Sequence, residues 1–162
     1  FFREANSYLD KLDYISAYIH FYMILEYCFA EGKFSAEQKK NFRKSDMLKY
    51  AVLSTINMIK EQNYNLYLKI QQICTDKHKE LNFDSLIDII YCYRGELSHA
   101  TKRAVYEENQ ELVKPITLFI SFVCFSVCGN MKVYCKKFVP EETRKHRVNE
   151  HIKRLELQLG LK

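Results

Sequence analysis

The scarcity of residues that break regular structure limits the folds open to this chain more than any other feature. Only 4 Gly and 2 Pro occur among its 162 residues, whereas average proteins contain about 7% Gly and about 5% Pro. A β-sandwich or β-barrel needs a turn about every ten residues, and Gly and Pro supply many of those turns. The sequence therefore argues against a turn-rich β protein and favours long, uninterrupted helices.

Apolar side chains return every three or four residues along most of the chain, which is the spacing of a helix packed on one face. No stretch alternates polar and apolar residues in the way of a half-buried strand. The sequence therefore predicts an all-α protein, a single up-and-down bundle of five to seven helices. Residues 1–140 would form the bundle, and residues 141–162 would form a basic C-terminal helix that packs on it or extends from it.

Residues that cap or interrupt helices mark the expected boundaries. A first apolar stripe, from Tyr8 onward, is expected to run without a break to Gly32. The later boundaries are expected at Ser35 with Gln38 in a capping box, at Ser45 or Asp46, near Asn63 and Asn65, at Asn82 or Asp84, in a polar link over residues 101–111, and at Pro140.

A long apolar helix is expected after the polar link. The 17 residues between Lys114 and Lys132 carry no charge, and a membrane-spanning helix needs about 20 apolar residues. Pro115, Gly129 and several polar residues dilute the stretch, so we expect a central helix that is buried on all sides, partly in a dimer interface. A membrane span is the minor alternative, and no membrane partner is expected.

The cysteines give no sign of a metal or disulfide framework. The six of them lie among apolar or aromatic neighbours, and no two form a C-x-x-C pair. They are therefore expected to be reduced core thiols of a cytoplasmic protein, with no bound metal and no cofactor.

One short segment combines residues whose side chains could take part in catalysis. Arg94 and His99 follow a strongly apolar stretch. An Arg guanidinium can grip a phosphate and stabilise the charge that builds on it, and a His can move a proton near neutral pH. Such a pair would suit cleavage of RNA, whose 2′-hydroxyl is a built-in nucleophile. Glu96 would orient the imidazole, and Ser98 would add a hydrogen bond to the phosphate.

The spacing of Arg94 and His99 sets a geometric condition. Five residues on an ideal helix place two side chains about 140° apart. The pair would meet only if the helix unwinds near Gly95 or if the long Arg side chain reaches back across the turn. The alternative is a solvated Arg94 and Glu96, with His99 as a cation at the end of the helix.

The form R-x4-H, from Arg94 to His99, resembles the signature of the HEPN superfamily, the higher eukaryotes and prokaryotes nucleotide-binding domains. The segment Tyr-Arg-Gly-Glu-Leu-Ser-His-Ala is most similar to sequences of the Apea-like and abortive-infection branches of this superfamily. Residues 13–26, which end in Glu26, resemble the family's opening helix. The resemblance implies a helical bundle that forms a two-fold homodimer with one composite cleft. It also implies a metal-independent endoribonuclease that leaves a 2′,3′-cyclic phosphate and a 5′-hydroxyl.

Under this resemblance Arg94 would bind the phosphate, His99 would transfer protons, and Glu26 would brace either of them from the first helix. The alternative for Glu26 is a lone polar residue in an apolar helix. Two positions depart from the family. Some toxin members carry a Tyr where this chain has Thr101, and Gly95 stands where strong nucleases commonly have a polar residue. Thr101 argues against control by modification of that tyrosine, and Gly95 leaves room for a weak or inactive member.

The charge of the chain is concentrated after the motif. Residues 1–101 hold 13 basic and 13 acidic side chains, whereas residues 102–162 hold 12 and 7, which accounts for the net +5. A basic end of this kind suits a polyanion such as single-stranded RNA. The candidate RNA-binding residues are Lys102, Arg103, Lys136, Lys137, Arg144, Lys145 and Arg147. The alternative for the residues of the last helix is a solvated face interleaved with Glu.

The sequence thus predicts a cytoplasmic HEPN-type endoribonuclease acting in phage defence, in a toxin–antitoxin pair or in a stress response, with an antitoxin or a fused domain as a further partner. The alternative is a non-catalytic HEPN-like module of a larger protein that binds RNA, a nucleotide or a partner helix; the start at Phe1 rather than Met favours it. A small membrane-associated helical protein is the third hypothesis.

Overall fold

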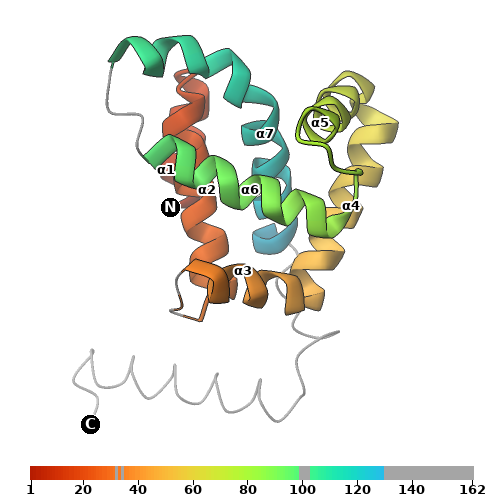
Figure 1. The fold of residues 1–162 in the computed structure, drawn as a ribbon. Coiled ribbons are helices and arrows are strands. Elements are labelled where there is room, and N and C mark those ends of the chain that lie inside the picture. Colours follow the sequence, from red (N-terminus) through yellow and green to blue (C-terminus); the bar gives the residue numbers. More distant parts are fainter. Residues whose placement is uncertain (32, 34, 99–102, 130–162) are drawn as a thin grey trace, which may run out of the picture. The chain divides into compact units, whose positions relative to one another are not determined.

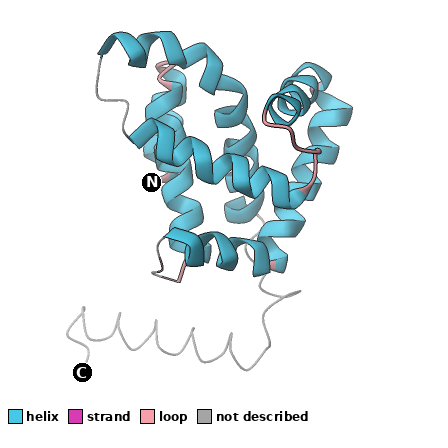
Figure 2. Cartoon of the chain, viewed as in Figure 1, coloured by secondary structure: helices cyan, strands magenta, loops and turns pink. Residues whose placement is uncertain are grey.

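The computed structural model describes residues 1–31, 33, 35–98 and 103–129 (Figure 1). Seven helices and no strand occur in this part of the chain (Figure 2), which confirms the all-α fold. The chain divides into two compact units, Phe1–Cys128 and Gly129–Lys162. The seven helices belong to the first unit, apart from Gly129 at the end of the last helix. The boundary expected between residues 140 and 141 lies outside the described residues.

The helices do not all run up and down. In chain order they are α1 (Phe2–Asp10), α2 (Tyr14–Phe29), α3 (Ser35–Lys44), α4 (Asp46–Gln62), α5 (Tyr64–Asp76), α6 (Phe83–Ser98) and α7 (Arg103–Gly129). Figure 1 shows α3 and α6 running across the direction of α2. The crossing brings the second half of α6, which carries the candidate motif, toward α2.

Short polar side chains begin four of the helices. Ser45 accepts a hydrogen bond from the backbone N–H of Leu48, and Asn63 accepts one from that of Leu66, each at 3.2 Å. Asn82 accepts one from Ser85 at 2.9 Å, and Asp13 accepts one from Ser16 at 3.0 Å. Each cap satisfies a backbone donor that the first helical turn leaves unpaired. The predicted starts at Ser45, Asn63 and Asn82 are therefore confirmed.

The uninterrupted first helix was a wrong expectation. The chain breaks between α1 and α2 at Leu12, whose φ of 58° lies in the left-handed region. The N–H of Asp13 donates to the carbonyl of Tyr8, and that of Leu12 donates to the carbonyl of Leu9, both at 2.9 Å. These two bonds form a Schellman motif, which usually places Gly at the left-handed position. Because Leu stands there, the sequence offered no stop signal.

One other local expectation differs from the structure. The expected polar link over residues 101–111 is helical from Arg103 onward, since nothing in that stretch breaks a helix. Gln38, expected to close a capping box with Ser35, donates a hydrogen bond from its Nε2 to Glu26 on α2, and the capping box itself stays a prediction. The start of α3 at Ser35 is confirmed.

The core is built around α2, which packs in parallel with α7. The hydroxyl of Thr117 donates to the carbonyl of Tyr14 at 3.0 Å, and the thiol of Cys124 donates to that of Phe21 at 3.4 Å. Both pairs are separated by 103 residues, so the two helices keep one register over two turns. Small polar side chains at these two positions let α7 approach the backbone of α2 closely.

The apolar helix α7 is a core helix with one open face. By length and composition its residues Gln110–Gly129, with a mean hydropathy of 1.9, could cross a membrane. In the fold 44% of this stretch is buried, and Phe119 and Val123 are completely inaccessible. Leu112 and Phe125 are 68% and 63% exposed, so the single chain leaves one face of the helix open, and the expected burial of that face in a dimer interface stays a prediction. Pro115 lies inside the helix, which bends along its length in Figure 1, as helices with an internal proline do.

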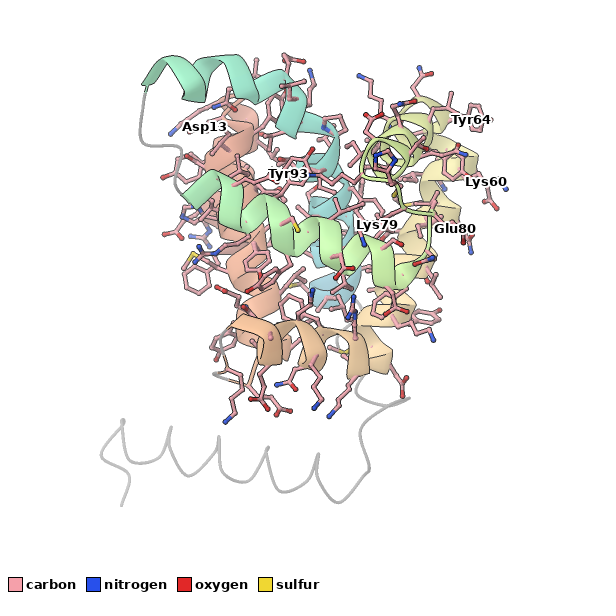
Figure 3. The ribbon with its side chains drawn as sticks, in the orientation of Figure 1. Asp13, Lys60, Tyr64, Lys79, Glu80 and Tyr93 are labelled. Atoms are coloured by element: carbon pink, nitrogen blue, oxygen red, sulfur yellow. The ribbon has the colours of Figure 1, made fainter. Side chains whose placement is uncertain are left out.

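A half-buried carboxylate ties α3 to α6. Asp88 on α6 is 17% exposed and lies 3.1 Å from Lys39, 2.6 Å from Arg43 and 3.0 Å from Lys79. Lys79 comes from the loop before α6 (Figure 3). Burial acts against the charge of Asp88, but hydrogen bonds from Lys79 and Lys39 and the charge of Arg43 outweigh it and lower its pKa. The carboxylate is therefore ionised in the folded protein.

Replacing Asp88 with Asn should destabilise the fold by about 1–2 kcal/mol at pH 7, because three cations then face each other without a counter-charge. Since folding lowers the pKa of Asp88, its contribution is present above pH 4 and is lost as the pH falls through the folded value. Urea unfolding at pH 7 and pH 3 measures both effects. Asp84→Asn is the control, because Asp84 is 71% exposed and pairs only loosely with Arg43. Equal losses in the two variants would contradict the prediction.

Candidate functional site

The described part of the motif lies where α6 crosses α2. Arg94 is half-buried, and its guanidinium carbon lies 6.0 Å from the centre of the Tyr22 ring, which is the outer limit of a cation–π contact. The helix continues through Gly95 to Ser98, so it does not unwind at Gly95. His99 lies outside the described residues, and its distance from Arg94 stays untested.

Tyr22 is a site residue that the sequence analysis missed. Its side chain is 1% exposed, and its hydroxyl is buried without a hydrogen-bond partner in the described part of the chain. Burial raises the pKa of Tyr22, the nearby charge of Glu26 and the Tyr91 phenol raise it further, and only Arg94 acts to lower it. The hydroxyl is therefore neutral over the whole physiological range and can donate a hydrogen bond. In sequence it looked like one more aromatic core residue.

Glu26 lies one turn after Tyr22 on the same face of α2. Its Oε1 accepts a hydrogen bond of 2.7 Å from the Nε2 of Gln38 on α3. Gln38 itself is only 4% exposed, so the bond holds the carboxylate in place. Glu26 from α2 and Arg94 from α6 therefore lie near Tyr22, and Gln38 from α3 is bonded to Glu26. The bracing role predicted for Glu26 stays a prediction.

The other supporting residues have separate surroundings. Glu96 is 57% exposed and pairs with Lys77 at 3.3 Å. The Nζ of Lys77 also lies 5.2 Å from the centre of the Tyr93 ring, which Figure 3 labels on α6. The role predicted for Glu96, orienting the imidazole of His99, stays a prediction. Ser98 is the last residue of α6.

The candidate RNA-binding residues fall almost entirely outside the described part of the chain. Arg103 is the first residue of α7. The remaining six, Lys102, Lys136, Lys137, Arg144, Lys145 and Arg147, lie in the stretches that the structure does not describe. Their proposed contact with RNA stays a prediction.

The five cysteines of the described residues are free thiols with different surroundings. Cys74 and Cys124 are buried, but Cys92 and Cys128 are exposed, so the expectation that all are core thiols was wrong for these two. Burial raises the pKa of Cys74 and Cys124, and neighbouring atoms that remove part of the water around the exposed Cys128 raise its pKa as well, which keeps these thiols protonated and weakly nucleophilic. Within residues 1–98 and 103–129, as far as they are described, no three His, Cys, Asp or Glu side chains form a metal-binding group.

Gly95 is exposed on α6, and a methyl group added there would meet no atom within 4 Å. The fold therefore does not require a glycine. Replacing Gly95 with Ala should stabilise the protein by about 0.5–1 kcal/mol, because Gly is a poor helix former. Urea unfolding tests this, and a loss of stability would contradict it. If a partner backbone or RNA approaches at Gly95, the same variant will lose binding or cleavage while it gains stability.

The resemblance to the HEPN superfamily depends on a short motif and on an opening helix that ends in Glu26. The structure adds that Glu26 and the motif residue Arg94 lie near the same tyrosine. Comparisons with protein-family models, with curated proteins and with solved structures found no match to this chain.

Proposed function

We propose that this protein is a HEPN-type endoribonuclease that cleaves single-stranded RNA without a metal. One observation carries the proposal: Arg94 on α6 and Glu26 on α2 both act on the buried hydroxyl of Tyr22, which has no hydrogen-bond partner among the described residues. A cation, a neutral hydrogen-bond donor and a fixed carboxylate within one small region are the groups that a phosphodiester and its 2′-hydroxyl require.

In the proposed reaction the 2′-oxygen attacks the adjacent phosphorus, and the bond from phosphorus to the 5′-oxygen of the next nucleotide breaks. Arg94 binds the non-bridging oxygens and stabilises the charge that builds on them. His99 serves proton transfer, since the 2′-hydroxyl loses a proton and the departing 5′-oxygen gains one. The products are a 2′,3′-cyclic phosphate and a 5′-hydroxyl. Glu26 holds the polar cluster in position.

The same proposal includes a two-fold homodimer whose two motifs form one cleft, as the resemblance implies. The protein would act in the cytoplasm in phage defence, a toxin–antitoxin pair or a stress response. The exposed apolar residues Leu112 and Phe125 of α7 would suit a contact between two copies or with an antitoxin or fused domain.

The test is cleavage of a labelled single-stranded RNA by the purified protein in EDTA, with chemical identification of the new ends. A cyclic phosphate that depends on His99, tested by His99→Ala, is the expected product. Cleavage that EDTA abolishes, or that continues unchanged in His99→Ala, would overturn the proposed mechanism.

Replacing Tyr22 with Phe should raise the stability of the fold and lower the rate of cleavage. The variant removes a buried hydroxyl that lacks a partner in the described residues, and relieving such a group is worth about 1 kcal/mol. If the hydroxyl helps to hold Arg94 and Glu26 in position, cleavage should fall about tenfold or more. Tyr18→Phe is the matched control, because the Tyr18 hydroxyl donates to the carbonyl of Ile90 and its removal should destabilise the fold. A destabilised Tyr22→Phe would show that the hydroxyl is paired.

The alternative is a non-catalytic HEPN-like module that binds RNA or a nucleotide. The bond from Gln38 to Glu26 favours it, since a carboxylate fixed in this way is suited to recognising a ligand as well as to supporting catalysis. Nucleotide binding without any RNA cleavage would support this alternative.

A further inference from the structure

Helices α2 and α7 run in the same direction (Figure 1) and bring two cysteines to the same end of the pair. The thiol of Cys124 on α7 donates to the carbonyl of Phe21 on α2, and the same offset of 103 residues joins the two helices seven residues earlier. Cys28 follows Phe21 by seven residues and therefore continues the face of α2 that contacts α7. Cys128 follows Cys124 by about one turn. The register thus places Cys28 and Cys128 next to each other on facing helices.

The surroundings of these thiols agree with the register. Burial raises the pKa of Cys28, and the nearby Cys128 thiol raises it further. Burial also raises the pKa of Cys124, and the thiols of Cys128 and Cys28 both add to this effect. The three thiols therefore form one cluster at the ends of α2 and α7.

Two members of this cluster are open to a reagent and one is not. Cys128 is exposed, and Cys28 is half-buried and lines a cavity of about 370 Å³. Cys124 is completely inaccessible, and its thiol is bonded to the backbone of α2. A small oxidant from the solvent can therefore reach Cys28 and Cys128 but not Cys124.

The close approach of the two helices suits a short covalent bridge. A disulfide needs Cα atoms about 4.4–6.8 Å apart. The thiol of Cys124 reaches a carbonyl of α2 directly at 3.4 Å, so only one small side chain separates the two backbones at this level. Side chains on a helix lean toward its N-terminus, which turns the thiol of Cys28 back toward the level of Cys128.

We propose that Cys28 and Cys128 are a redox pair that closes into a disulfide and joins the ends of α2 and α7. The oxidant is a hydroperoxide, such as hydrogen peroxide. The thiolate of the exposed Cys128 attacks a peroxide oxygen, the O–O bond breaks, and a sulfenic acid and one water form. The sulfur of Cys28 then attacks the sulfenic sulfur, the S–O bond breaks, and the disulfide and a second water form. The two sulfurs lose two electrons to the peroxide, and the two thiol protons end in water.

The bridge would act on the fold rather than on a substrate. It closes a loop with 99 residues between the two cysteines, and such a long loop strongly restricts the unfolded chain. The midpoint of thermal unfolding should therefore rise by about 5–15 °C. The bridge also fixes α2, the helix that carries Tyr22 and Glu26, to the core helix α7. The disulfide would form whether or not the protein cleaves RNA.

Peptide mapping of the full chain after treatment with hydrogen peroxide tests the proposal. Free thiols are blocked with iodoacetamide, and the non-reduced digest should contain one linked pair of peptides, with Cys28 in one and Cys128 in the other. Dithiothreitol should reverse both the link and the rise in the unfolding midpoint. Because a thiolate is the attacking group and the pKa values of both thiols are raised, formation should be slow at pH 7 and should speed up about tenfold per pH unit.

Serine variants give the controls. Cys28→Ser and Cys128→Ser should each abolish the link and the rise in the midpoint, whereas Cys92→Ser, which removes an exposed thiol on α6, should change neither. Cys135→Ser should also keep the link, which excludes pairing with a cysteine outside the described residues. Each variant is compared with its own reduced form, so a stability change caused by the substitution itself does not affect the result. A link between any other two cysteines, or oxidation to sulfinic acid without a link, would overturn the proposal.

Discussion

Replacing Arg94 with Ala should reduce kcat/KM for RNA cleavage by about 10²–10³-fold, the usual cost of losing a group that stabilises transition-state charge. The guanidinium is the only cation that acts on the Tyr22 hydroxyl among the described residues. Arg94→Lys keeps the charge but loses the planar fork that binds two phosphate oxygens at once. We therefore expect Lys to restore only part of the activity.

The fold should survive this change. Arg94 is half-buried, and its contact with Tyr22 is at the outer limit of a cation–π interaction, so the loss of this contact should cost no more than about 1 kcal/mol of stability. Arg3→Ala is the matched control, because Arg3 is exposed on α1. Steady-state cleavage and urea unfolding of the three variants separate chemistry from folding. Full activity in Arg94→Ala would show that the catalytic site lies elsewhere.

Replacing Phe119 with Ala should destabilise the fold by about 3–5 kcal/mol, since it opens a cavity in the core. Phe119 is completely buried in α7. A domain of this size has a total stability of about 5–15 kcal/mol, so the variant should be largely unfolded by mild heating. Phe125→Ala is the control on the same helix. Phe125 is 63% exposed, and its loss should change the stability by less than about 0.5 kcal/mol.

This pair of variants also distinguishes a core helix from a membrane span. In a membrane both phenylalanines would face lipid or protein of similar polarity. Replacing either one with Ala would then change the stability by a comparable amount. In the described fold only Phe119 is covered. Thermal unfolding monitored by circular dichroism gives the comparison. Similar effects of the two changes, or a need for detergent during purification, would contradict the assignment of α7 to a core.

The predicted gain of stability in Tyr22→Phe has a consequence for the site. A buried hydroxyl without a hydrogen-bond partner lowers the stability of the fold. Proteins retain such destabilising groups where function needs them. Tyr22, Glu26 and Arg94 would then lower stability together in exchange for a preorganised site. The double variant Tyr22→Phe with Arg94→Ala tests whether the two residues act as a unit, because their effects on cleavage would then not add.

The helix starts could be predicted because caps are local. Ser45, Asn63 and Asn82 each bond a backbone N–H three residues later, so a short stretch of sequence contains both partners. The break at Leu12 could not be predicted in this way. A Leu in the left-handed region is costly by itself, and packing between α1 and α2 must compensate, as in the contact of the Phe2 and Phe21 rings at 5.9 Å.

The candidate site was predictable only in part. Arg94 and Glu26 stood out in sequence as charged residues beside apolar stretches, and the resemblance to a known motif connected them. Tyr22 and Gln38 did not stand out, because their importance depends on what lies next to them. Tyr22 matters since its hydroxyl is enclosed without a partner in the described residues, and Gln38 matters since α3 brings it to within 2.7 Å of Glu26.

The sequence by itself determined that this chain is helical and where most of its helices begin, because the helical period and the caps act over a few residues. It also marked Arg94 and Glu26, which are 68 positions apart. Only the tertiary structure decided that these two residues act on one tyrosine and that Gln38 fixes the carboxylate. Each of these depends on how α3 and α6 cross α2, and crossings are set by the packing of whole helix surfaces rather than by any local pattern.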